Sequence, residues 1–177
     1  VQPRSRGLGD VYKRQGCYFS HLNVLKKFLS TNEDFALVCE DDIEFNKDII
    51  QIINGALNSS IHFDLLRLSG GSDRNKEKGT PIKLQKIYKD FYLSLNLGFK
   101  SGTGCYLINR HAAKNILNKL NKMSLPIDHA MDRDWLLSIR SLSISPAPVY
   151  LKEELHEGNS YIQAKSEFKY SFYRRYW

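Results

Sequence analysis

Two short apolar runs on either side of a helical segment constrain the fold of this chain most. Residues 35–39 (FALVC) and 63–68 (FDLLRL) are too short for ordinary helices and predict strands that are buried on both faces. Between them, residues 47–57 repeat isoleucine and leucine at the spacing of an amphipathic helix. Strand, helix and strand in this order predict a parallel pair with a right-handed crossover, and therefore an α/β fold with a mostly parallel central sheet.

The same periodicity adds further elements around this unit. Helical spacing predicts helices over residues 16–30, over 110–122 and from Pro126 onward. An edge strand is predicted at 83–88 and a further strand at 105–108. Residues 143–151, interrupted by two prolines, predict an edge strand or an extended segment.

Composition limits the classes of protein. The chain has 177 residues, 42% of them hydrophobic, so it can bury the core of one ordinary domain. Its net charge of +7 suits an anionic ligand, but no basic helix or stacking motif accompanies it, so we expect no nucleic-acid partner. The three cysteines form no CxxC pair and predict reduced thiols in a cytoplasmic protein.

Residues 1–15 differ from the rest of the chain. They contain three Gly or Pro breakers and no apolar periodicity, and they resemble translated adapter sequence. We therefore predict that 1–15 is an extraneous leader and that the folded domain occupies 16–177.

Three adjacent carboxylates, Glu40, Asp41 and Asp42, follow the first apolar run directly. Ligands of open α/β sheets bind beyond the carboxyl ends of strands, and alternation places Glu40 and Asp42 on one side of an extended chain. Oxygen ligands of this kind suit Mn2+ or Mg2+. A solvated polar strand end, with Asp42 capping a turn, is the alternative. Repulsion between neighbouring like charges favours the cation.

Four blocks of the sequence together resemble one enzyme family. The blocks are GCYFSHL at 16–22, ALVCEDDI at 36–43, GTGCYLI at 102–108 and PID at 126–128. In order and spacing they are similar to glycosyltransferase family 25, the bacterial lipooligosaccharide galactosyltransferases. The resemblance implies a GT-A-like nucleotide-sugar fold. It also implies inverting, metal-dependent transfer of a hexose, galactose first, from a UDP-sugar to a saccharide hydroxyl during lipooligosaccharide biosynthesis.

The resemblance also assigns roles to residues. Asp42 and Glu40 would hold Mn2+ (or Mg2+), and Glu40 and Asp41 would also contact the donor. Asp128 would be the base that accepts the proton of the acceptor hydroxyl. An acidic residue in a first helical turn is favoured by the helix dipole in any case, and Asp132, one turn later, is the rival base.

Two further pairs are candidates for donor binding. Ser20 and His21 are predicted to open the first helix, where free backbone N–H groups could meet an anion, although Ser20 could equally be a simple N-cap. Gly102 and Thr103 lie in a glycine-rich turn that would allow close approach of the donor sugar, or that only reverses the chain.

The resemblance finally bears on the ends of the chain and on its partners. The leader stands where the family has an N-terminal strand and helix, so we expect 16–177 to be a partial catalytic domain that lacks them and binds UDP weakly. A nucleotide- or glycan-binding domain without turnover is the alternative.

The acceptor would be a saccharide or a lipid-linked glycan. The aromatic and basic residues 168–177 predict peripheral contact with the inner face of the cytoplasmic membrane, or a terminal helix docked on its own domain.

Overall fold

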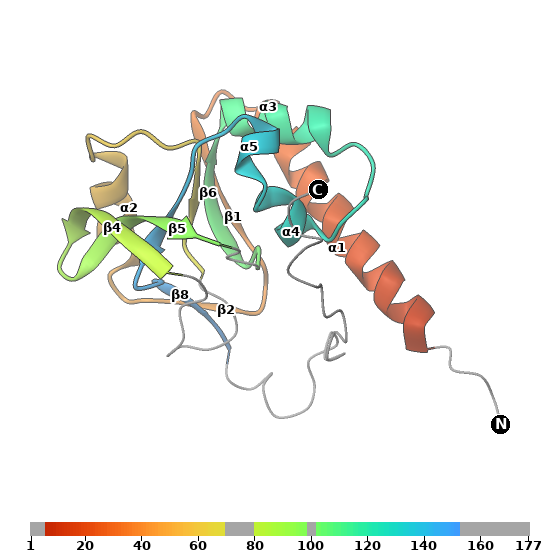
Figure 1. Cartoon of the computed structure of the whole chain (residues 1–177), viewed down its shortest axis with the longest axis horizontal. Helices are drawn as coiled ribbons and strands as arrows, with labels where there is room; N and C mark the ends of the chain where they lie inside the picture. Colours follow the sequence, from red (N-terminus) through yellow and green to blue (C-terminus); the bar gives the residue numbers. More distant parts are fainter. Residues whose placement is uncertain (1–5, 70–79, 99–101, 153–177) are drawn as a thin grey trace.

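The computed structural model describes residues 6–69, 80–98 and 102–152. Its helices are α1 (Arg6–Leu29), α2 (Ile49–Leu57), α3 (Arg110–Lys119), α4 (Ile127–Met131) and α5 (Asp134–Leu137). Its strands are β1 (Phe35–Cys39), β2 (Ile43–Phe45), β3 (Leu65–Arg67), β4 (Thr80–Tyr88), β5 (Phe91–Leu97), β6 (Cys105–Asn109), β7 (Ser141–Ser145) and β8 (Val149–Leu151). The fold class is α/β, as predicted (Figure 1).

A six-stranded sheet in the order β1-β6-β3-β7-β5-β4 forms the centre, and β2 pairs with β8 in a separate two-stranded sheet. Only the β3–β7 ladder of the central sheet is parallel among the described strands, and its other ladders are antiparallel. The prediction of a mostly parallel sheet is therefore wrong. Strands β1 and β3 do run in the same direction, but β6 lies between them and is antiparallel to both. A buried apolar run has the same appearance in either kind of ladder, so the sequence pattern could not distinguish them.

Each face of the central sheet has its own hydrophobic core. On one face, α1, α3, α4 and α5 cover β1 and β6, and α2 lies on the other side (Figure 1). Successive strand residues divide between the cores, because side chains alternate along a strand. Leu65 and Tyr106 belong to the first core, whereas Leu66 and Cys105 belong to the second.

Several predicted elements differ in extent or position. Helix α1 begins at Arg6, ten residues before the predicted start at residue 16. Strand β7 lies inside the sheet between β3 and β5, so its prediction as an edge strand is wrong. The two prolines fall between β7 and β8 and interrupt neither ladder. Strand β4 is an edge strand, as predicted, and its partner β5 was not predicted.

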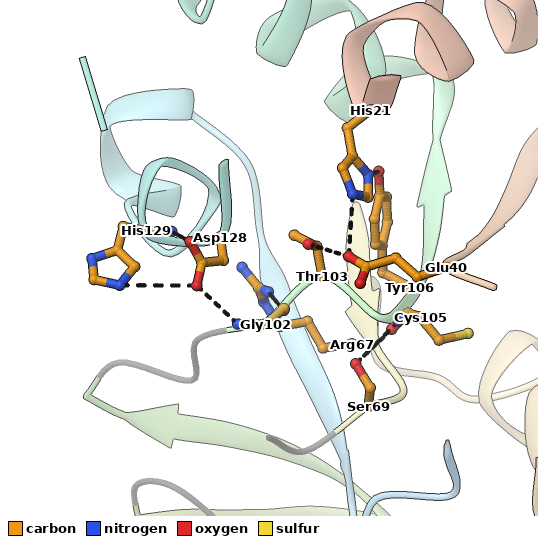
Figure 2. A network of polar contacts seen from close by, with 10 residues as sticks. All are labelled: His21, Glu40, Arg67, Ser69, Gly102, Thr103, Cys105, Tyr106, Asp128 and His129. Carbon is orange, nitrogen blue, oxygen red and sulfur yellow. Dashed lines mark hydrogen bonds and ion pairs between the residues drawn. The ribbon is translucent and has the colours of Figure 1, made fainter. Parts of the chain in front are cut away.

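The fold gathers several chain segments at one edge of the sheet. Because β1 and β3 are both antiparallel to β6, they end where β6 begins: Cys39 pairs with Cys105, and Arg67 pairs with Tyr106. The loops beyond these ends meet one face of α1 and the start of α4 (Figure 2). In the described ranges, no helix is both long and apolar enough to span a bilayer.

Candidate active site

The three carboxylates form the turn between β1 and β2. The backbone N–H of Glu40 donates to the carbonyl of Gly104 at 2.8 Å, which extends the β1–β6 pairing by one step. Lys152 holds the other side of the turn: its backbone N–H donates to the Asp42 carbonyl at 2.9 Å and its Nζ donates to the Asp41 carbonyl at 3.0 Å. Asp41 is exposed, whereas Glu40 and Asp42 are half-buried.

Glu40 points into the site, where two side chains contact the same oxygen atom (Figure 2). The Thr103 hydroxyl donates to Glu40 Oε1 at 2.7 Å, and His21 Nε2 lies 3.4 Å from that oxygen. Hydrogen bonding from His21 holds the pKa of Glu40 below its usual range despite partial burial, with a further contribution from Thr103. Glu40 is therefore ionised and fixed in direction at neutral pH.

His21 is itself oriented by a buried neighbour. Its Nδ1 lies 2.9 Å from the hydroxyl of Tyr106, and both side chains are buried. Cys17 precedes His21 by one turn of α1. Burial first, and then the negative charges of Glu40, Asp128 and Asp42, together raise the pKa of the Cys17 thiol to about 11. The fold thus brings these three carboxylates within electrostatic range of one face of α1.

Asp42 has the chemistry expected of a cation ligand. Its Oδ1 is buried and has no hydrogen-bond partner among the residues that the structure describes. Burial raises the pKa of Asp42, and the charges of Glu40 and Asp41 add to this effect. A buried carboxylate oxygen without a donor is costly unless something positive approaches it. The donor set at Asp42 and Glu40 therefore fits a hard divalent cation such as Mn2+ or Mg2+.

Asp128 lies in the first turn of α4, on the far side of the glycine-rich loop. Its Oδ2 accepts a hydrogen bond of 3.3 Å from the backbone N–H of Gly102, and its Oδ1 accepts one of 2.9 Å from the N–H of His129. The ring nitrogen Nε2 of His129 lies 3.9 Å from Oδ2 (Figure 2). The Asp128 side chain remains 26% exposed, so a substrate hydroxyl can reach it.

A buried ion pair that the sequence analysis did not predict holds the glycine-rich loop at Gly102 in place. Arg67 Nη1 donates to the carbonyl of Gly102 at 2.7 Å, and Arg67 Nη2 lies 2.8 Å from Oδ1 of Asp132. Gly102 thereby joins Arg67 to Asp128, and its φ of +92° is one that favours glycine. The available signal was an arginine inside the apolar run 65–68, because a charge in a buried strand needs a partner.

Most of the predicted site residues meet at this edge. Hydrogen bonds join His21 and Thr103 to Glu40, and another joins Gly102 to Asp128 (Figure 2). Gly102 and Thr103 are neighbours in the chain, so the two groups lie side by side. Ser20 is exposed and does not join them. Helix α1 runs through both Ser20 and His21, so the prediction that these two residues open the first helix, with Ser20 as its possible N-cap, is wrong. The contact of Ser20 with a donor stays a prediction. Residues 168–177 lie outside the described residues.

The structure is therefore an α/β domain in which an acidic turn and a glycine-rich loop meet at one edge of the central sheet. The sequence model of glycosyltransferase family 25 (LPS biosynthesis protein) matches residues 9–131, more than half of the chain. The search of curated proteins found no sequence that matches this chain. The match begins within the predicted leader and includes every predicted site residue from Ser20 to Asp128. The chain belongs to glycosyltransferase family 25, which supports a glycosyltransferase that takes a donor sugar and an acceptor glycan as substrates.

Proposed function

We propose that the chain transfers a hexose from a UDP-sugar to a saccharide hydroxyl, with inversion at the anomeric carbon. Galactose is the hexose that we favour. The acceptor belongs to lipooligosaccharide or another cell-surface glycan, and the reaction takes place in the cytoplasm or at the inner face of the membrane. The fold is GT-A-like in this proposal. The observation that carries the proposal is the buried Oδ1 of Asp42, which lacks a hydrogen-bond partner in the described part of the chain.

Asp42 and Glu40 are the proposed ligands of Mn2+ or Mg2+. When bound between Asp42 and Glu40, the cation would supply positive charge that offsets the negative charge developing on the departing UDP. Glu40 is suited to this role because Thr103 and His21 keep it ionised and directed into the site. Asp41 contacts the ribose or sugar in this proposal, which its exposure permits.

Asp128 is the proposed base. It accepts the proton of the acceptor hydroxyl on its carboxylate as that oxygen attacks the anomeric carbon. Two observations favour Asp128 over Asp132. The Asp132 carboxylate is paired with Arg67 and almost fully buried, whereas Asp128 is partly exposed and faces the loop at Gly102. A base must reach its substrate, so this difference in accessibility supports Asp128.

The loop at Gly102 and Thr103 is the proposed contact with the donor sugar. Gly102 is held by Arg67 and Asp128 together, and Thr103 is tied to Glu40. The loop therefore links the proposed base to the proposed cation ligands. Binding of the donor and position of the base are coupled through it, which orients the acceptor oxygen relative to the anomeric carbon.

A UDP-release assay tests the proposal. The protein is incubated with UDP-galactose, UDP-glucose or UDP-N-acetylglucosamine, with lipooligosaccharide acceptors, and with Mn2+ or a chelator. We expect release that needs Mn2+ and acceptor and that is lost in Asp42→Asn and in Asp128→Asn. Asp90→Asn is the matched control, because this carboxylate is 94% exposed on the β4–β5 turn. Mn2+-dependent UDP binding without release on any acceptor would favour the alternative of a binding domain without turnover.

A further inference from the structure

A second group of potential ligands lies beside the acidic turn, on α1. Cys17 Sγ, a ring nitrogen of His21 and a carboxylate oxygen of Glu40 all lie within 4.8 Å of one another. We propose that these three side chains form a site for a thiophilic divalent cation of the Zn2+ class. This site shares Glu40 with the proposed hard-cation site at Asp42 but takes its other two ligands, Cys17 and His21, from α1. Its test does not require the proposed transfer reaction.

The backbone already holds the ligands close to the required geometry. Cys17 and His21 are four residues apart on α1, so they project from the same face of the helix. Packing fixes that face, because Tyr18, Leu22 and Leu25 are buried in the core beside it. With zinc–sulfur and zinc–nitrogen bonds of about 2.3 and 2.0 Å, tetrahedral ligand atoms lie about 3.5 Å apart. Closing the cluster therefore needs side-chain shifts on the order of 1 Å.

Two outer contacts match those of protein metal sites. A histidine that binds a metal through one ring nitrogen generally donates from the other. Tyr106, 2.9 Å from His21 Nδ1, can accept that hydrogen bond in the buried interior once the cation has replaced the proton on Nε2, the ring nitrogen that lies 3.4 Å from Glu40 Oε1. The Thr103 hydroxyl similarly holds Glu40 Oε1 at 2.7 Å. Both ligands are thus oriented by neighbours that are not themselves ligands.

The chemistry of the set selects the class of cation. A thiolate, an imidazole and a carboxylate suit Zn2+ or Co2+, whereas Mg2+ and Mn2+ prefer oxygen. Cys17 releases its thiol proton to solvent on binding. The thiolate and the carboxylate together carry the two negative charges that balance a dication. Three protein ligands leave a fourth position for water or another ligand.

Cobalt spectroscopy tests the site directly. The full chain, reduced and stripped of metal, is titrated with Co2+ without oxygen. We expect one equivalent to give thiolate-to-cobalt charge-transfer absorption together with the visible bands of tetrahedral cobalt, and Zn2+ to remove both. The charge-transfer band is expected to disappear in Cys17→Ser and Cys17→Ala. His21→Asn should weaken Co2+ binding at least tenfold.

Cys39→Ser is the matched control, since Cys39 is a free thiol close to Cys105, with the two sulfur atoms 3.6 Å apart. It should keep the band, and so should Asp42→Asn, which separates this inference from the proposed transfer reaction. Circular dichroism shows whether each variant is folded. Absence of the band in the reduced wild-type protein, its persistence in both folded Cys17 variants, or its loss in Cys39→Ser would overturn the inference.

Discussion

Arg67 and Asp132 form an ion pair of 2.8 Å in which the two side chains are 4% and 5% exposed. Removing one member of such a pair leaves an uncompensated buried charge, which typically costs about 3–5 kcal/mol. We therefore expect Asp132→Asn to lower the free energy of unfolding by roughly that amount. Asp128→Asn should cost less than about 1 kcal/mol, since its carboxylate is partly exposed and its hydrogen bonds are long or local.

Urea denaturation and UDP release, measured on both variants, separate the two roles. Asp128→Asn should remain folded and lose turnover. Asp132→Asn should be less stable than the wild type but should retain some activity at low temperature, where it is folded. A stable Asp132→Asn protein without activity would instead make Asp132 the base.

Thr103 provides a second test, because its hydroxyl donates the 2.7 Å hydrogen bond to Glu40. Hydrogen bonds to charged groups are worth about 1.5–3 kcal/mol. We expect Thr103→Val to free the Glu40 carboxylate and weaken Mn2+-dependent UDP binding about tenfold or more. Thr103→Ser keeps the hydroxyl and should bind nearly as well. Calorimetry on the two variants makes the comparison, and an equal loss of binding in Thr103→Ser would contradict the role assigned to the hydroxyl.

We expect the Asp42→Asn substitution to leave the stability of the fold intact while it removes Mn2+ binding. Its pKa is raised in the folded protein by burial and by Glu40, so the ionised form is disfavoured there. Asp42 therefore lowers the free energy of unfolding: the loss begins as the pH rises above the unfolded-state pKa and is complete above the folded-state pKa. At neutral pH, Asp42→Asn should therefore be at least as stable as the wild type.

Thermal melting with and without Mn2+ measures both effects of Asp42. Mn2+ should raise the Tm of the wild-type protein and leave that of Asp42→Asn unchanged, because only a ligand that binds the folded state stabilises it. Asp41→Asn is the control for charge alone, since Asp41 is exposed. A Tm that falls in Asp42→Asn without metal would mean that this carboxylate has a stabilising partner.

The sequence predicted local features of this site better than it predicted the arrangement of strands. Glu40 and Asp42 follow a strand, and Asp128 opens a helix, as their neighbours in the sequence indicated. The antiparallel insertion of β6 between β1 and β3 depends on long-range pairing that no local period encodes. The start of α1 was missed because glycines at 7 and 9 obscure helical periodicity.

Long-range partners were the least predictable part of the site. Tyr106 looked like an ordinary strand residue, and its contact with His21 depends on how α1 packs on β6. The pairing of Arg67 with Asp132 similarly joins β3 to the end of α4. Residue types suggested that such groups need partners, but only the fold identified which ones.

Asp64 gives the chain a specific acid sensitivity. It lies just before β3 and accepts hydrogen bonds from the Arg140 backbone, the Asn109 side chain and His62. Burial opposes its ionisation, but these hydrogen bonds, with that of Arg140 first, hold the pKa of Asp64 below its usual range. Its stabilising contribution is therefore present above the unfolded-state pKa and is lost as the pH falls through the folded-state pKa.

We expect Asp64→Asn to lower the free energy of unfolding by about 1–3 kcal/mol at neutral pH and by much less in acid. Urea denaturation between about pH 7 and pH 3 measures this convergence. His62→Ala is the control, because His62 is 70% exposed and is only one of several donors. Parallel stability curves for the wild type and Asp64→Asn across that range would contradict the assignment.

Two glycines should respond in opposite ways to the same substitution. Both lie in helices, where alanine is normally favoured over glycine by about 1 kcal/mol. A Cβ at Gly16 of α1 would meet nothing within 4 Å, so Gly16→Ala should raise stability by about 0.5–1 kcal/mol. A Cβ at Gly55 of α2 would lie 2.5 Å from the backbone carbonyl oxygen of Ile87, forcing α2 away from β4. Gly55→Ala should therefore lower stability by about 1–2 kcal/mol despite its better helix propensity. Urea denaturation of the two variants gives the sign of each change, and a stabilised Gly55→Ala protein would mean that α2 is not packed this closely on β4.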